Sequence, residues 1–207
     1  MAKITKVEVQ KNNKQKVNIY LDGEYKARMY LDTCVKYGLH AGVEIEEDRL
    51  NELVLESEKV MALNLAVKYV STALKTKKQI VDYLKKKEFQ PEIIDYVVDK
   101  MLEYKYIDDM EYIRAYFNTY SNKFGISRLQ YNLRSKGVSQ KLIDEYMDSL
   151  EEEMDTLSTC ITLLKKKAKN IDLNDIKNRQ KVSRFLASRG FEFDDINHAM
   201  MEVTKER

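Results

Sequence analysis

The stretch that decides the fold is LRSKGVSQKLI, residues 133–143, because the chain contains three versions of it. The other two are LKKKEFQPEII at 84–94 and LASRGFEFDDI at 186–196. Each version begins with leucine, has a basic residue three places later and an apolar residue at the sixth place, and ends with isoleucine. A period of roughly fifty residues is typical of stacked structural repeats.

The positions around each leucine predict what one repeat looks like. Apolar residues recur four places before the leucine and fourteen places after it, namely at Ile80, Leu129 and Val182, then at Val98, Met147 and Met200. A spacing of four places two side chains on the same face of a helix. Gly137 and Gly190 fit the left-handed position that ends a helix, and Glu88 takes that place in the first copy at about 1 kcal/mol. Each copy therefore predicts a three-helix unit.

The first thirty residues follow a different pattern. Apolar and polar residues alternate around Val7 and Val9, then from Val17 to Leu21 and from Tyr25 to Met29, which is the period of half-buried strands. Asp22-Gly23 between two of these runs is a strong hairpin signal. We expect three antiparallel strands, followed by one or two helices in LDTCVKYGL and EEDRLNELVL.

The predicted fold class is mainly α, with tandem three-helix repeats in an elongated curved solenoid and a small N-terminal antiparallel β module. Four segments are expected. Residues 1–57 hold the β-hairpin module and its linking helices, and residues 58–106, 107–150 and 151–207 hold the three repeats.

Composition restricts the class of protein. Of the 207 residues 43% are apolar and 34% are charged, which is typical of a soluble globular protein. Cys34 and Cys160 have no paired spacing, which favours reduced thiols, and neither a signal peptide nor a membrane span is evident. We therefore expect a cytoplasmic protein without membrane contact. The net charge is only +2, but lysines cluster at 75–78, 85–87 and 165–169 and form local basic patches.

The sequence offers no evident active site. Asp108 and Asp109 with Glu111 could be considered metal ligands, but the spacing of Asp108 and Glu111 is that of a capping box that opens a helix at Met110. His40 and His198 have no partners at ligand spacing, and there is no phosphate-binding glycine loop or zinc-protease motif. The prediction is a protein that is not an enzyme and has no catalytic residue, metal or cofactor.

The candidate binding residues lie in the middle repeat. Tyr131 is three residues from both Arg128 and Arg134, so the three side chains are expected to be neighbours on a helix surface that turns partly away from Leu129. A tyrosine between arginines suits an acidic protein surface or a phosphate backbone with a base to stack on; an ordinary solvated helix is the alternative. Tyr112, Tyr116 and Tyr120 read as a core stripe. The full candidate set for partner or DNA binding is Arg128, Tyr131, Arg134, Lys136, Lys123 and Arg114.

The middle repeat resembles the signature region of RecX, the family of bacterial proteins that modulate the RecA recombinase. The matching elements are Ile107-Asp108-Asp109, the aromatic helix after them, Phe124-Gly125, and Leu133 through Val138; VKYGLHAGVEI at 35–45 also resembles one form of the family. The resemblance covers nearly the whole chain. The chain departs from the family pattern at Glu88 and in the third copy, where the Phe-Gly step is missing near Ile176.

The resemblance implies a repeat protein that docks along the groove of the RecA–DNA filament. There it would reduce ATP turnover, strand exchange and the stimulation of repressor cleavage in the SOS response. The leading hypothesis is a non-catalytic, monomeric regulator whose partner is the RecA–single-stranded DNA filament, with possible contacts to single- or double-stranded DNA. The alternative is a stand-alone helix-turn-helix-like DNA-binding protein. An enzyme such as a nuclease would need a metal site that the sequence does not show.

Overall fold

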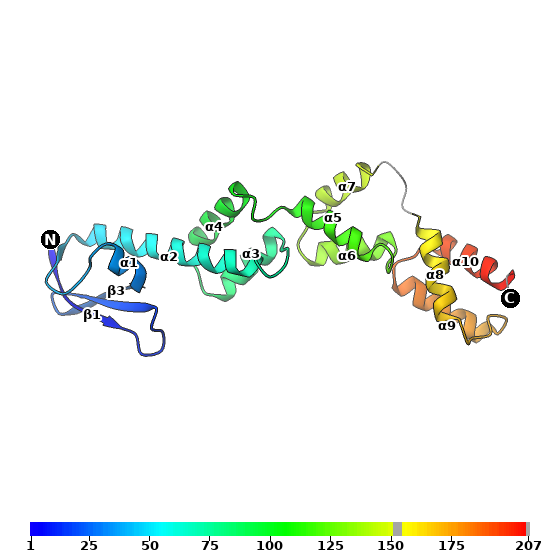
Figure 1. Cartoon of the computed structure of the whole chain (residues 1–207), viewed down its shortest axis with the longest axis horizontal. Coiled ribbons are helices and arrows are strands. Elements are labelled where there is room, and N and C mark those ends of the chain that lie inside the picture. Colours follow the sequence, from blue (N-terminus) through cyan, green and yellow to red (C-terminus); the bar gives the residue numbers. More distant parts are fainter. Residues whose placement is uncertain (151–154, 206–207) are drawn as a thin grey trace. The chain divides into compact units, whose positions relative to one another are not determined.

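The structure is a computed structural model that describes residues 1–150 and 155–205. Within these residues the chain forms four strands and ten helices, grouped into two compact units (Figure 1). The first unit holds residues 1–74 and 80–107. The second holds residues 75–79 and the described part of 108–207. No helix in the described ranges is long and apolar enough to cross a lipid bilayer.

The N-terminal module is an antiparallel sheet with the strand order β3-β2-β1-β4. The strands are β1 (Ala2–Val9), β2 (Lys16–Leu21), β3 (Glu24–Tyr30) and β4 (Glu44–Ile45). The predicted hairpin at Asp22-Gly23 is confirmed, since both residues have positive φ, 48° and 95°. The prediction of three strands was incomplete, because β4 pairs with the start of β1. A strand of two residues is too short to leave a periodic pattern.

An irregularity in β1 changes which side chains face the core. The register with β2 shifts between Ile4 and Lys6. Such a bulge reverses the alternation of side chains along the strand. Ile4 is fully buried, whereas Val9, which was expected on the inward face, is 49% exposed. After the shift, Val7 and Val9 pair with the buried Ile19 and Val17, so the predicted alternation is kept, and Val9 is exposed at the end of the strand.

A single helix, α2 (Glu47–Val70), connects the sheet to the first repeat. Its first half contributes Leu50 and Leu53 to the core under the sheet, and its second half contributes Ala62 and Ala66 to the next core. The sequence pattern predicts two separate helices here, divided near residue 57. One continuous helix serves both cores, so the predicted segment boundary falls inside it.

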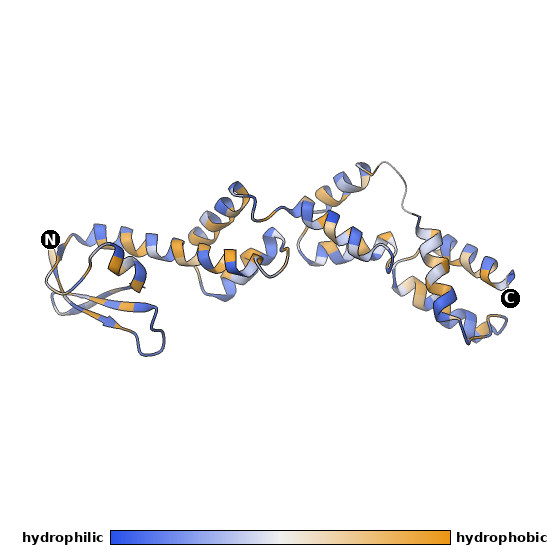
Figure 2. Ribbon diagram, in the orientation of Figure 1, coloured by the Kyte–Doolittle hydropathy of each residue, from blue (hydrophilic) through white to orange (hydrophobic). Residues whose placement is uncertain are grey.

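Three groups of three helices follow the pattern of the repeats. The first consists of the second half of α2, α3 (Lys77–Lys86) and α4 (Pro91–Glu103); the second of α5 (Asp109–Tyr120), α6 (Ile126–Ser135) and α7 (Gln140–Asp148); the third of α8 (Thr156–Lys167), α9 (Ile176–Ser188) and α10 (Phe193–Lys205). Apolar and polar stretches alternate along their helices (Figure 2), as expected of helices with one buried face. The predicted start of the third repeat at residue 151 lies outside the described residues.

The repeated positions have the same environment in each group. Leu84, Leu133 and Leu186 are all fully buried. Glu88, Gly137 and Gly190 all have positive φ, between 63° and 86°, as the sequence predicted. The mainly α class, the tandem three-helix repeats and the N-terminal antiparallel module are therefore confirmed. The elongated, curved solenoid stays a prediction.

Candidate partner-binding surface

The outer face of α6 carries the centre of the predicted site. Leu129 and Leu133 fix the inner face, since both are fully buried in the core of the second repeat. Tyr131 points away from that core and is 55% exposed. The guanidinium carbon of Arg128 lies 5.3 Å from the centre of the Tyr131 ring, within the range of a cation–π contact. The sequence prediction that these two side chains are neighbours is confirmed.

Arg134 is held differently. Its Nη1 donates a hydrogen bond to Oε1 of Gln140 at 2.7 Å, and Nε2 of Gln140 in turn donates to Asp144 at 2.6 Å. The guanidinium of Arg134 is therefore fixed against α7, whereas that of Arg128 lies over the Tyr131 ring. The three residues share α6, as expected, but the two guanidinium groups have different partners.

The other three candidates are more spread out. Lys136 ends α6, and its carbonyl accepts a hydrogen bond from Oγ1 of Thr76 at 2.7 Å. The Nζ of Lys123 lies 5.5 Å from the centre of the Tyr120 ring, and its carbonyl accepts from Nη1 of Arg189 at 3.3 Å. Arg114 is exposed on α5. The backbone carbonyl groups of Lys136 and Lys123 thus form hydrogen bonds within the protein, and only the side chains of these two residues are available to a partner.

A repeated junction, which the sequence analysis missed, supports this surface. Thr76 and Gly125 are equivalent, each eight residues before a repeat leucine; Lys136 and Arg189 are equivalent, each three residues after one. Thr76 donates to the carbonyl of Lys136, and the backbone N–H of Gly125 donates to the carbonyl of Arg189 at 3.0 Å. In both cases, the residue just before the second helix of one repeat forms a hydrogen bond with the turn that follows the second helix of the next repeat.

Close approach at these junctions requires glycine. A Cβ atom at Gly125 would lie 2.1 Å from the carbonyl oxygen of Gly190, and one at Gly190 would lie 2.4 Å from the backbone nitrogen of Arg128. A Cβ atom at Gly137 would lie 2.3 Å from the side chain of Lys78. From the sequence, Gly137 and Gly190 are explained by helix endings alone. The signal for the junction was the Phe124-Gly125 step, which has no local conformational need for glycine.

Aromatic side chains fill the space beside the junction. The rings of Tyr112, Tyr116, Tyr120 and Phe124 form a row with 4.6–6.3 Å between successive centres, and all four are half-buried against the core of the second repeat. The guanidinium of Arg189 completes the row, 5.7 Å from the centre of Phe124. The predicted core role of the tyrosine stripe agrees with this packing.

The acidic cluster at the start of α5 has a structural use. The Asp108 carboxylate accepts hydrogen bonds from the backbone N–H groups of Met110 and Glu111 at 2.8 and 3.1 Å, which caps α5 as predicted. The helix begins at Asp109, one residue earlier than expected. Asp109 accepts from the N–H of Lys77 at 2.8 Å, and burial raises the pKa of its carboxyl group. Among the described residues no group of three His, Cys, Asp or Glu side chains could hold a metal.

Comparison with known proteins gives a consistent result. Family models described as the RecX N-terminal domain, the first RecX three-helix domain and the third RecX three-helix domain match residues 2–46, 62–101 and 153–200. Each match lies inside one of the segments expected from the sequence.

Relatives match over nearly the whole chain. The chain is 32% identical to a regulatory protein RecX of Clostridium tetani, covering 97% of this chain and 94% of that protein. It is also 32% identical to that of Bacillus subtilis, covering 100% of this chain and 79% of the relative. A crystal structure of regulatory protein RecX superposes with a TM-score of 0.64 at 26% identity, covering 95% of this chain and 98% of that one.

Proposed function

The chain belongs to the RecX family of regulatory proteins, and on that premise we propose that it is a non-catalytic regulator of the RecA recombinase. In this proposal it binds the RecA–single-stranded DNA filament and inhibits both recombination and ATP hydrolysis. The name of its relatives points to a regulatory, non-catalytic role. Naming RecA as the partner rests on the family resemblance of residues 107–138.

The observation that carries the proposal is the exposed Arg128–Tyr131 pair on α6. A guanidinium over an aromatic face gives a flat surface with one positive charge, which suits a carboxylate or phosphate beside a planar group. If several repeats each contact a repeating filament, the first contact raises the effective concentration of the others, and the whole protein binds more tightly than one repeat alone.

The test is a titration of RecA ATP hydrolysis on single-stranded DNA with this protein. We expect the wild type to inhibit, and Arg128→Glu/Arg134→Glu to inhibit much more weakly while changing the free energy of unfolding by only about 0.5 kcal/mol, as is usual for exposed charges. Higher salt should weaken the wild type in the same direction. The matched control is Lys11→Glu/Lys14→Glu, which makes the same change of net charge at two exposed positions between β1 and β2. If the α6 variant folds and inhibits at wild-type concentrations, the α6 surface is not the contact.

The alternative of a stand-alone DNA-binding protein is favoured by one observation. Helix α6 belongs to a three-helix unit and exposes a basic and aromatic face, which suits contact with a nucleic acid. This alternative requires that the protein alone shifts a DNA duplex in a sequence-dependent way, without RecA. The regulator proposal requires tight binding only when RecA is present on the DNA.

A further inference from the structure

A groove on the third repeat has the composition of a second docking site. It lies between α9 and the start of α10, has a volume of about 470 Å³, and is lined by Ile176, Arg179, Gln180, Ser183, Arg184 and Phe193. Ile176 and Phe193 are 72% and 74% exposed. Exposed apolar side chains gathered at one place on a surface indicate a binding site more often than single ones do.

The groove is the third-repeat equivalent of the α6 surface. Counted from the repeat leucines, Gln180 corresponds to Ser127 and Arg184 corresponds to Tyr131. In the second repeat this place is in contact with polypeptide, because Oγ of Ser127 donates a hydrogen bond to the carboxylate of Glu192 at 2.6 Å. Glu192 follows the Gly190 turn that packs against the start of α6. Near Ser127 this face therefore contacts a turn that presents a carboxylate, whereas Tyr131, farther along the helix, is 55% exposed.

The third repeat differs where the next turn would dock. Ile176 begins α9 ten residues before Leu186, whereas Ile126 begins α6 seven residues before Leu133, so α9 is longer by about one turn. Asp175 caps the longer helix by accepting from the N–H of Lys177 at 2.9 Å. Because of this extra turn, the side chains of Ile176 and Arg179 stand near the place where the second repeat has the bare backbone of Gly125. A backbone junction has been replaced by an apolar and basic groove.

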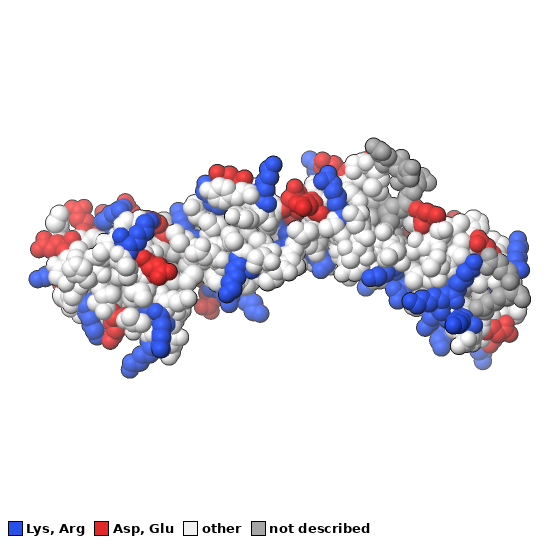
Figure 3. All heavy atoms as spheres, in the orientation of Figure 1, with Lys and Arg blue, Asp and Glu red and all other residues white. Residues whose placement is uncertain are grey.

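The charge on the described residues that line the groove is positive. Arg179 and Arg184 are the charged residues among them, and none of these described lining residues is acidic. Figure 3 shows Lys and Arg side chains gathered over α8 and α9. In the sequence of these two helices, the basic residues include Lys165, Lys166 and Lys167 at the end of α8 and Lys177 and Lys181 on α9. A ligand that fills the groove is therefore expected to carry negative charge.

We propose that this groove binds a turn of the RecA partner in which a large apolar side chain stands next to a carboxylate. The apolar side chain would lie between Ile176 and Phe193, and the carboxylate would bond to Arg179 or Arg184, whose planar guanidinium groups match it in shape. The inference rests on the proposed function for the identity of the partner. The chemistry of the bound turn comes from the contact between Ser127 and Glu192.

A second copy of the chain fits the groove less well. The turn after α3 is the equivalent of the one that carries Gly190 and Glu192, but it has Glu88 and Gln90 at these places. A Cβ atom at the glycine place is too close to its neighbours in both observed junctions, and Gln90 has no charge to offer the arginines. A nucleic acid strand would satisfy the arginines but leave Ile176 without an apolar partner. The groove therefore favours a foreign polypeptide.

The test compares variants of the full chain in binding to RecA–single-stranded DNA filaments. Ile176→Ser/Phe193→Ser removes the apolar walls, and Arg179→Glu/Arg184→Glu reverses the charge. Each should raise the dissociation constant at least tenfold, which corresponds to about 1.4 kcal/mol. Val35→Ser, at a residue that is 71% exposed on α1 (Leu31–Lys36), and Lys11→Glu/Lys14→Glu are the matched controls and should bind like the wild type. Thermal unfolding of every variant checks that it is folded.

The outcomes separate the two proposals. If the wild type binds filaments and both groove variants bind equally well, the groove is not a docking site, while the proposed function stands. If the wild type itself does not bind filaments, the proposed function is wrong and the RecA turn is excluded as the occupant. If the groove variants lose affinity for single-stranded DNA alone to the same extent as for the filament, the occupant is nucleic acid and the polypeptide assignment is overturned.

Discussion

Gly190 shows at the scale of a single residue how the repeats constrain the sequence. Its φ of 83° favours glycine, and a Cβ atom there would meet the backbone of Arg128. Glu88 holds the equivalent place in the first repeat with a φ of 63°. The first repeat has no earlier repeat whose second helix could pack on this turn. A side chain is therefore tolerated at Glu88 at the cost of backbone strain, but not at Gly190.

This difference predicts opposite effects of substitution. Gly190→Ala should lower the free energy of unfolding by about 2–4 kcal/mol, because overpacking is added to about 1 kcal/mol of backbone strain. Glu88→Gly should leave stability unchanged or raise it by up to about 1 kcal/mol. Gly38→Ala is the control, since Gly38 has a φ of 61° but no atom within 4 Å of the added Cβ. Urea unfolding measures all three, and equal losses in Gly190→Ala and Gly38→Ala would show that the junction exerts no steric pressure.

Cys160 predicts a pH dependence. It is fully buried, and burial raises the pKa of its thiol to about 12 from an ordinary value of 9.0. Between these pH values the Cys160 thiol loses its proton in the unfolded chain and keeps it in the folded chain. The stability that the buried thiol contributes is therefore complete below pH 9 and is lost as pH rises toward 12. The difference in unfolding free energy between the wild type and Cys160→Ala should therefore shrink as pH rises above 9.

The same burial should protect the thiols from reagents. Cys34 is also buried, and burial raises the pKa of its thiol as well. We expect a thiol reagent at pH 8 to label neither cysteine in the folded protein and both in denaturant, because the thiolate is the reactive form. Rapid labelling of Cys160 in the native protein would contradict its burial.

At the scale of elements, each repeat is organised around its second helix. Leu84 on α3, Leu133 on α6 and Leu186 on α9 are each fully buried in a separate core. The residue four places earlier on each helix is also fully buried, so side chains from two successive turns of each helix point into the core. Protein interiors are close-packed, so the loss of a leucine from any of the three cores leaves a cavity.

Equivalent leucines should therefore have equivalent effects. Leu84→Ala, Leu133→Ala and Leu186→Ala should each destabilise the protein by about 2–5 kcal/mol, measured by denaturant unfolding. Leu74→Ala is the control and should change stability by no more than about 0.5 kcal/mol, since Leu74 is 50% exposed. A repeat leucine whose replacement behaved like that of Leu74 would not occupy a core position.

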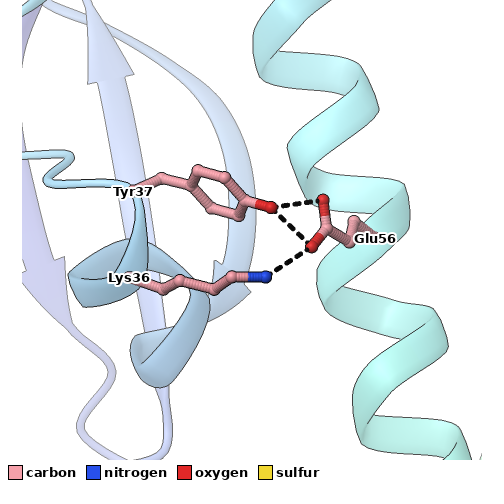
Figure 4. Close-up of polar contacts among 3 residues, drawn as sticks. All are labelled: Lys36, Tyr37 and Glu56. Atoms are coloured by element: carbon pink, nitrogen blue, oxygen red, sulfur yellow. Dashed lines mark hydrogen bonds and ion pairs between the residues drawn. The ribbon is translucent and has the colours of Figure 1, made fainter.

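At the scale of the whole molecule, the N-terminal module depends on α2. Leu50 and Leu53 of α2 complete the core under the sheet, and the buried Ser57 accepts a hydrogen bond from the N–H of Tyr30 at 2.8 Å. Figure 4 shows a further link, in which the hydroxyl of Tyr37 and the Nζ of Lys36 both donate to the carboxylate of Glu56, at 2.6 and 3.0 Å. These hydrogen bonds lower the pKa of the Glu56 carboxyl group, and the bond from Tyr37 has the largest effect.

A fragment of residues 1–45 should therefore remain unfolded. It contains all four strands but lacks α2, and a sheet of this size is marginal without a packing partner. A fragment of residues 1–107, which includes α2, should fold. Amide NMR spectra measure the difference, with dispersed signals expected only for the longer fragment. Dispersed signals from residues 1–45 would show that the module is independent.

The sequence by itself determined the features that depend on local conformation and on periodic burial. The three leucines, the left-handed places at Glu88 and Gly190, the cap at Asp108 and the Asp22-Gly23 hairpin follow from patterns within a few residues. The Arg128–Tyr131 pair followed as well, because residues three apart on a helix are neighbours.

Only the tertiary structure decided the features that join distant parts of the chain. It paired β4 with β1, made α2 one helix between two cores, turned Arg134 toward Gln140, and brought Gly125 against Gly190, 65 residues away in sequence. It also left Ile176 and Phe193 exposed beside two arginines. The periodic pattern of a sequence records how deeply each side chain is buried but not which element covers it, so such contacts are set by how the elements pack.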